Sequence, residues 1–276
     1  MAAMRVAILG GNGQVGQALA EIFPSATALG RSECDVTRPD SVRAALRGFD
    51  LAINCAAVVD VEGCQRDPAL AWAVNAAGAR WVAQSARAVV YLSSDYVFDG
   101  RGGAPYAEWA APNPLFVYGA SKLAGEQETL QHAERAWVVR TSWIFGGPGK
   151  SFVNTMRRLM PGRERLEVVA DEVGGPTYAP DLARAIRDLV GRDAPGTYHL
   201  ANSGEASRYE WARAIATLTG AATDVRPTTR RAYLAANPAL LPRPAHSTLA
   251  NYAARRLGVE LRPWQNALCE HLCASR

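Results

Sequence analysis

Short apolar segments alternate with helix-forming segments along the first half of the chain. RVAILG, SATALG, DLAINCAA, AVVYLSS and AWVVRTSWIFG have the short, β-branched character of buried strands, and segments such as QVGQALAEIF and PDSVRAALRG between them favour helices. Strands that alternate with helices form parallel sheets whose two faces are covered by the helices. This order therefore predicts an α/β fold with a doubly wound parallel sheet.

Prolines interrupt the alternation in the second half of the chain, from about residue 147. Because proline removes a backbone donor and ends helices and central strands, the later elements should be shorter and less regular. We predict one domain over residues 1–146 and a smaller C-terminal α/β lobe over residues 147–276, with some later segments returning to the first domain.

Composition and charge narrow the class of protein. The 276 residues are 49% hydrophobic, and 30 basic against 26 acidic side chains give a net charge of +4 that is spread along the chain. Such a weak charge does not indicate nucleic-acid binding. The first residues, MAAMRVAILG, run directly into a strand pattern, and the sequence contains no apolar run of membrane-spanning length. We expect a soluble cytoplasmic protein that does not act on membranes.

The cysteines number five, and their spacing suggests neither a disulfide framework nor a metal site. Cys269, His271 and Cys273 lie close together in CEHLC. On a helix, however, the histidine would point away from the two thiols, and a fourth ligand is missing. We expect reduced thiols and no bound metal.

A glycine-rich turn follows the first predicted strand directly. In LGGNGQVG, Gly10, Gly13 and Gly16 open the first predicted helix, together with Asn12, Gln14 and Val15. Glycines in this position let the backbone approach a pyrophosphate, which the positive end of the helix attracts. The spacing is G-x-x-G-x-x-G. At the front of a strand–helix–strand series, it predicts a Rossmann domain that binds a dinucleotide.

The end of the second predicted strand indicates which dinucleotide binds. NAD sites usually carry an acidic residue there for the ribose 2′-hydroxyl, but ALGRSECDV has Arg31 instead. A guanidinium suits a 2′-phosphate, so we predict NADPH as the cofactor, with NADH as the alternative. Asp35 and Val36 should then flank the adenine. The other interpretation of Arg31 is a solvated surface charge.

A tyrosine and a lysine lie four residues apart in VYGASKLAGE. On a helix this spacing places Tyr118 and Lys122 on one face, one turn apart. A carbonyl that accepts hydride also needs a proton, which a tyrosine still carries at neutral pH, and a nearby ammonium stabilises the tyrosinate left behind. Ser94, at the end of AVVYLSS, should hydrogen-bond the substrate oxygen and hold it in place.

These motifs together resemble those of the extended short-chain dehydrogenase/reductases. More narrowly, SSDYVFDG, PYAEWAAPNPLFVYGASKLAGE, VVRTSWIFGGPGKSFVNTM, VVADEVGGPTYAPDLA and LPRPAHSTLANYAARRLG resemble successive blocks of the dTDP-4-dehydrorhamnose reductase family. The resemblance covers nearly the whole chain. It implies NADPH-dependent reduction of the 4-keto group of a dTDP-linked deoxysugar, with Ser94, Tyr118 and Lys122 as catalytic residues.

The same resemblance implies further site residues. It places Cys55, Ala56, Ala57 and Asn75 beside the cofactor, Asp95 and Tyr96 in the sugar pocket, and Trp143, Thr177 and Arg243 along the substrate cleft. Each of the last three has a purely structural alternative: a core ring, a turn residue and a surface charge. An arginine is nevertheless apt for a pyrophosphate-bearing substrate.

Departures from the family pattern leave the sugar open. Related dehydratases carry an Asp-Glu pair where this chain has Asp95 and Tyr96, which argues against dehydration. After the third strand, Val58 and Val59 replace an aromatic and a hydroxyl residue, and His246 replaces an asparagine. The alternatives are therefore a reductase of another nucleotide keto-sugar from a specialised deoxysugar pathway, or a non-catalytic NADP-binding regulatory subunit. Some members of the family form a metal-linked dimer through an acidic residue at the position of Ala18, which argues against that dimer here. We expect a monomer or a homodimer.

Overall fold

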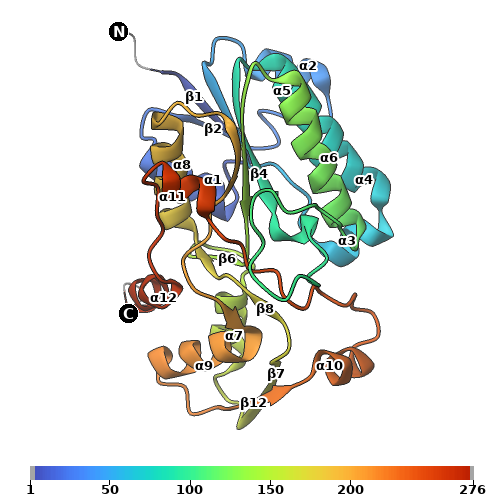
Figure 1. The fold of residues 1–276 in the computed structure, drawn as a ribbon, viewed down its shortest axis with the longest axis vertical. Coiled ribbons are helices and arrows are strands. Elements are labelled where there is room, and N and C mark those ends of the chain that lie inside the picture. The colour runs from blue at the N-terminus through green and yellow to red at the C-terminus, as the bar shows by residue number, and fades with distance from the viewer. Residues whose placement is uncertain (1–3, 274–276) are drawn as a thin grey trace.

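A computed structural model describes residues 4–273 of the chain. Its centre is a six-stranded parallel sheet in the order β10-β5-β4-β3-β1-β2 (Figure 1). The strands are β1 (Val6–Leu9), β2 (Thr27–Leu29), β3 (Leu51–Asn54), β4 (Ala88–Ser94), β5 (Arg135–Thr141) and β10 (Gly196–His199). The predicted α/β fold with a doubly wound parallel sheet is confirmed.

Helices cover both faces of this sheet. On one face α1 (Gln14–Ile22) packs against α8 (Ala179–Gly191), and α11 (Tyr252–Arg256) contacts β10. The other face is covered by α2 (Pro39–Ala45), α5 (Gly78–Ser85) and α6 (Val117–His132). The buried strands are almost entirely apolar on both sides, which is the pattern expected when helices exclude water from both faces.

The first half of the chain adds shorter helices beside α6. These are α3 (Val61–Arg66), α4 (Pro68–Trp72), the π-helical turn η1 (Ala73–Ala77) and the 3-10 turn η2 (Asp95–Val97). Two of these elements lead into α5, because α4, η1 and then α5 follow one another along the chain. The π-helical turn contains Asn75, whose side chain is fully buried.

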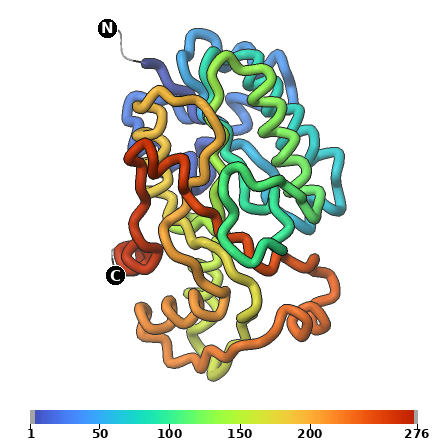
Figure 2. The backbone as a smooth tube through the Cα atoms, in the orientation of Figure 1, coloured from blue at the N-terminus to red at the C-terminus, as the bar shows by residue number. Residues whose placement is uncertain are grey.

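A smaller lobe forms below the carboxyl edge of the sheet (Figures 1 and 2). Its strand pairs are β7 (Arg165–Val169) with β12 (Asp224–Thr228), β8 (Val173–Gly174) with β11 (Ala206–Ser207), and β6 (Ile144–Phe145) with β9 (Thr177–Tyr178). Its helices are α7 (Phe152–Leu159), α9 (Arg208–Thr219), α10 (Arg230–Ala236) and α12 (Trp264–Cys273). Phe145, Trp211 and Trp264 centre its separate apolar core. The predicted boundary near residue 146 stays a prediction. From the later half of the chain, β10 joins the main sheet and α8 packs against α1 beside it.

One predicted strand is divided in two. AWVVRTSWIFG forms β5 and then β6, because Trp143 between them has φ 44°, in the left-handed region that side chains rarely adopt. The chain leaves the main sheet at this residue and enters the lobe. The interruption therefore places an indole at the junction between the two parts.

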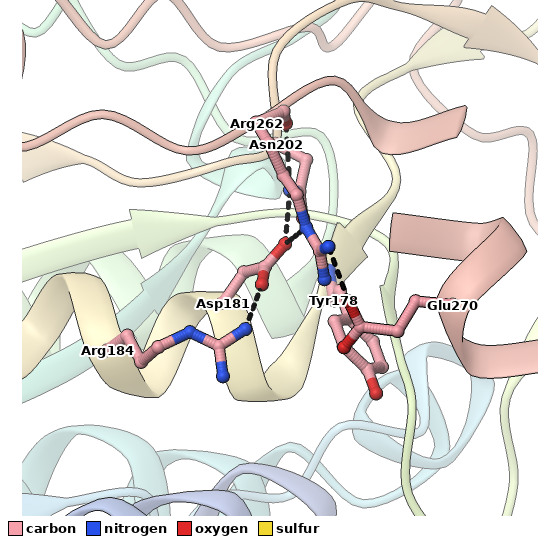
Figure 3. Close-up of polar contacts among 6 residues, drawn as sticks. All are labelled: Tyr178, Asp181, Arg184, Asn202, Arg262 and Glu270. Carbon is pink, nitrogen blue, oxygen red and sulfur yellow. Dashed lines mark hydrogen bonds and ion pairs between the residues drawn. The ribbon is translucent and has the colours of Figure 1, made fainter. Parts of the chain in front are cut away.

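A cluster of polar side chains joins the C-terminal segment to α8 (Figure 3). Asp181 accepts hydrogen bonds from Arg184, from Asn202 at 2.8 Å and from Arg262 at 2.8 Å, and Arg262 also binds Glu270 on α12. Asn202 in turn accepts from the backbone N–H of Tyr178 at 2.7 Å. We call this the junction cluster, and its residues are Tyr178, Asp181, Arg184, Asn202, Arg262 and Glu270.

Candidate active site

The glycine turn after β1 is built for close approach of a ligand to the backbone. Gly10 has φ 73°, and a Cβ there would lie 2.9 Å from the backbone nitrogen of Ala56. A Cβ on Gly16 would overlap the carbonyl oxygen of Gly10. Gly13 caps α1 without a side chain, so the first turn of the helix keeps backbone N–H groups available. This surface fits a pyrophosphate.

A cleft of about 740 Å³ extends from this turn along the carboxyl edge of the sheet toward the smaller lobe. Its volume suits a dinucleotide or a nucleotide-sized ligand. Many of the predicted site residues line it: Gly10, Asn12, Gly13, Gln14, Val15, Gly16, Cys55, Ala57, Ser94, Asp95, Tyr96, Tyr118, Lys122, Trp143 and Arg243.

Tyr118 and Lys122 lie on the first two turns of α6, and both line the cleft together with Ser94. Burial raises the pKa of Tyr118, so its hydroxyl is protonated at neutral pH. Burial lowers the pKa of Lys122 to about 7, against the opposing influence of Glu126, and only 2% of this residue is exposed. The ammonium lies 4.2 Å from the centre of the Tyr91 ring.

Ser94 is held by polar contacts on several sides. Its hydroxyl donates to Asp95 at 3.0 Å and accepts from the backbone N–H of Tyr96 at 3.2 Å. Ser247 donates to the other carboxylate oxygen of Asp95 at 2.6 Å. Burial raises the pKa of Asp95 to about 6, although these hydroxyl bonds oppose the shift. The arrangement fixes Ser94 beside Tyr118 and keeps a carboxyl group directly behind it.

Sequence reasoning missed a buried ion pair behind Lys122. Glu126, one turn further along α6, accepts two hydrogen bonds from Arg140, at 2.9 and 2.7 Å, and a third from Ser93 at 2.5 Å. This bidentate pair ties α6 to β4 and β5, and Glu126 raises the pKa of Lys122 against the effect of burial. The i, i+4 spacing of Lys122 and Glu126 in KLAGE was a sequence signal for the influence of Glu126 on Lys122, but not for the ion pair with Arg140.

The lobe side of the cleft carries two arginines. Arg243, which was predicted, pairs with Glu62 at 2.8 Å. Arg208, which was not predicted, begins α9 and places its guanidinium carbon 3.5 Å from the centre of the Trp143 ring. Both side chains line the cleft. Arg208 carried no sequence signal because it meets Trp143 only through the tertiary fold.

Several predicted cofactor and substrate residues do not line the cleft. Arg31 and Asp35 form a loose ion pair of 3.8 Å at the end of β2, and Val36 is buried against Gly78. Asn75 uses its amide on the backbone of Val58 and on Ser121, so it supports the loop after β3. Ala56 and Thr177 are also absent from the lining, and the Thr177 hydroxyl bonds to Gly175.

Other predicted features of the chain lie away from the cleft. The CEHLC segment lies on α12, where the two sulfur atoms are 3.8 Å apart. The His271 ring meets Phe145 edge-on and Tyr178 at a tilt, with ring centres 5.8 Å apart in both pairs. Within residues 4–273, no group of three or more potential ligands is placed to hold a metal ion. None of the helices described is both long and apolar enough to cross a lipid bilayer. His246 pairs with Glu205 at 3.0 Å and lies outside the cleft lining.

Comparison with known proteins agrees with this geometry. The family model described as RmlD substrate binding domain matches residues 4–276. A dTDP-4-dehydrorhamnose reductase of Mycolicibacterium smegmatis is 39% identical over 99% of this chain and 86% of its own length. A Streptomyces antibioticus protein named as a probable dTDP-4,6-dihydroxy-2-methyloxan-3-one 4-ketoreductase is 40% identical over 97% of this chain and 94% of its own length.

A solved structure is also similar over its whole length. The dTDP-4-dehydrorhamnose reductase of Bacillus anthracis, determined in complex with NADP, superimposes with a TM-score of 0.93 at 34% identity and covers 100% of both chains. Together with the family model and the sequence relatives, this similarity extends over the sheet domain and the smaller lobe alike. The chain belongs to the dTDP-4-dehydrorhamnose reductase family, as its motifs predicted.

Proposed function

We propose that this protein catalyses the NADPH-dependent reduction of the 4-keto group of a dTDP-linked deoxysugar. The observation that carries the proposal is that Ser94, Tyr118 and the buried Lys122 line one cleft, which continues to the glycine turn. A protonated phenol, a hydroxyl that orients it and a buried amine are the groups that carbonyl reduction requires.

The cofactor would lie on the chain's own backbone and side chains. Gly10, Gly13 and Gly16 would hold the pyrophosphate at the start of α1, and Arg31 would receive the 2′-phosphate of NADPH. When bound, the reduced nicotinamide supplies the hydride. The relative from Bacillus anthracis was determined with NADP, which supports the same cofactor here.

Tyr118 donates the proton that the reduced oxygen needs. Its raised pKa keeps the hydroxyl protonated before the reaction, and Ser94 lies in the same cleft to orient it. Once the phenol is deprotonated, Lys122 stabilises the tyrosinate, and the new negative charge raises the pKa of that lysine from about 7. Ser94 turns from Asp95 toward the substrate oxygen and holds it within reach of Tyr118.

The identity of the sugar has two candidates. The first is dTDP-4-dehydro-rhamnose, the substrate in the name of most relatives compared. The second is a 2,6-dideoxy-4-keto sugar, because Val59 lines the cleft where the family has polar side chains and the Streptomyces antibioticus relative is named for such a keto-sugar. Val58 and Val59 offer no side-chain hydrogen bond to a sugar hydroxyl.

The decisive experiment supplies NADPH and a panel of nucleotide keto-sugars to the purified protein and follows the loss of nicotinamide absorbance. A higher kcat/KM for dTDP-4-dehydro-rhamnose than for its 2-deoxy analogue supports the first sugar, and the reverse order supports the second. Absence of turnover with every dTDP-keto sugar, while NADPH binds, would contradict the proposal and favour a regulatory subunit.

We further propose that the protein acts in the cytoplasm, as a monomer or a homodimer.

A further inference from the structure

Arg208 occupies an electrostatically unfavourable position. It is the first residue of α9, where a capping box between Ser207 and Glu210 fixes the start of the helix. Helix N-termini favour acidic side chains, because the backbone N–H groups there carry partial positive charge. An arginine that points into a cleft from such a position opposes the helix dipole, so the fold alone gives no reason for this cation.

The guanidinium is held mainly by aromatic groups. It lies 3.5 Å from the centre of the Trp143 ring and 5.2 Å from the centre of the Phe152 ring, and the Tyr96 side chain acts on it electrostatically. Among residues 4–273, no carboxylate lies within ion-pair distance of Arg208; Asp95 and Glu172 act on it only from further away. The Trp143 indole beneath it packs directly on Gly174. A Cβ on Gly174 would overlap Cε2 of this indole.

Arg243 provides the contrast within the same cleft. Its guanidinium donates to Glu62 at 2.8 Å and to the carbonyl oxygen of Leu241 at 3.3 Å, so part of its fork is already occupied. Arg208 and Arg243 both act electrostatically on Tyr96 and on Glu172. The two cations therefore face the same region of the cleft, and Arg208 is the one without a carboxylate partner in the part of the chain described.

We propose that Arg208 binds the diphosphate of the substrate, together with Arg243, and thereby selects nucleoside diphosphate sugars. This inference rests on the proposed function and adds a binding residue to it. A planar guanidinium that already stacks on a ring keeps its in-plane N–H groups free for two phosphate oxygens, and its immobilisation costs little further entropy on binding.

The position of Tyr96 indicates the diphosphate, not the keto group, as the partner. The Tyr96 and Tyr118 rings meet edge to face with their centres 6.0 Å apart, and Arg208 acts electrostatically on Tyr96. A pyranose whose 4-keto oxygen accepts a proton from Tyr118 carries its phosphate at C1, on the opposite side of the ring. Tyr96 contacts Tyr118 and interacts with Arg208, which favours the diphosphate over the keto oxygen as the partner of this cation.

The test uses dTDP as the probe and titration calorimetry on the full chain. Arg208→Met keeps much of the stacking surface but removes the charge, and we expect the Kd for dTDP to rise at least tenfold and to depend less steeply on salt. The control is Arg213→Met on the same helix, because Arg213 is exposed and lies near Tyr209, away from the cleft lining. We expect this control to bind dTDP like the unaltered protein.

A wild-type Kd for dTDP in the folded Arg208→Met protein would overturn the inference. So would equal weakening by Arg213→Met. If Arg208→Met fails to fold, Arg208→Lys decides: it retains the charge but loses the bidentate fork, so a Kd about three- to tenfold higher supports the inference and an unchanged Kd overturns it. Because dTDP is not turned over, Arg208-dependent binding without reductase activity would refute only the proposed function, and activity with Arg208-independent binding would refute only this inference.

Discussion

The active-site cleft and the junction cluster both bury charged groups, but they treat these charges differently. In the junction cluster, Asp181 binds Arg184, Asn202 and Arg262, and bonds to Glu270 and Asp181 raise the pKa of Arg262 (Figure 3). In the cleft, burial lowers the pKa of Lys122 to about 7 and raises that of Asp95 to about 6. The charged form of Arg262 is therefore stabilised at the junction, whereas the charged forms of Lys122 and Asp95 are disfavoured in the cleft.

This difference separates structural from functional charge. A buried ion whose partners are all within the protein holds two elements together and is insensitive to ligands. A buried ionisable group without a full set of partners costs stability and titrates near neutral pH, which is useful only where a substrate, a cofactor or a proton arrives. The comparison predicts that changes in the cleft alter catalysis and changes in the junction cluster alter stability.

The largest expected effect is that of Tyr118→Phe. This change removes the proton donor and leaves the ring in place, so we expect turnover to fall by about 10² to 10⁴. The affinity for NADPH, measured by fluorescence titration, should remain within about threefold, because the hydroxyl contributes little to the cofactor surface. Normal turnover in this variant would show that another group supplies the proton.

The junction cluster should respond in the opposite way. Asp181 is 7% exposed and accepts from three side chains, so Asp181→Asn leaves Arg184 without its counter-charge and Arg262 with Glu270 alone. We expect a loss of about 2 to 4 kcal/mol in the free energy of unfolding, measured with urea, and a kcat at permissive temperature close to that of the unaltered protein.

Asp188→Asn on the same helix is the matched control. Asp188 forms an exposed pair with Arg187, so its loss should change the stability by less than about 1 kcal/mol. Loss of turnover in Asp181→Asn protein that remains folded would contradict the structural role of the junction cluster.

The pH dependence of the free energy of unfolding should reveal the cost of burying the Lys122 ammonium. The folded protein holds this group with a pKa of about 7, whereas the ordinary value is 10.5, so between these limits the unfolded chain binds more protons. The penalty for burying the ammonium is therefore full below about pH 7 and disappears as the pH rises toward 10.5. The stability advantage of Lys122→Met over the unaltered, cofactor-free protein should shrink by up to about 1.4 kcal/mol per pH unit from pH 7 to 9. A difference independent of pH over this range would contradict the prediction.

The smallest expected effect concerns cofactor choice at the turn after β2. Arg31 is 79% exposed and only loosely paired with Asp35, so it is available to a 2′-phosphate. We expect Arg31→Ala to weaken NADPH binding about tenfold and leave NADH binding nearly unchanged. Arg43→Ala, which removes a comparably exposed arginine on α2, should change neither affinity. Equal affinity of the unaltered protein for the two cofactors would remove the basis of this prediction.

Local sequence pattern was sufficient for the sheet, the glycine turn and the Tyr118–Lys122 pair. Each depends on residues close together in the chain: a strand followed at once by glycines, or two side chains one helical turn apart. The same reasoning joined β5 and β6, because nothing in the local pattern shows that Trp143 adopts a left-handed conformation.

The lobe side of the cleft could not be predicted in the same way. Arg208 meets Trp143 and Tyr96 across 65 and 112 positions of the sequence, and only the packing of α9 under the sheet edge brings them together. Asn75 was expected beside the cofactor, yet the π-helical turn directs its amide to Val58 and Ser121. Contacts between distant segments have no period that a single sequence can display.

A titration of the Lys122 side-chain nitrogen by ¹⁵N NMR, in the cofactor-free protein, tests the contrast between cleft and junction most directly. Lys122→Met identifies the signal by its disappearance. The account predicts an apparent pKa near 7 for this ammonium, well below the ordinary lysine value of 10.5. A value near 10.5 for Lys122 would show that the buried charge is fully compensated, as at the junction cluster, and would contradict the account.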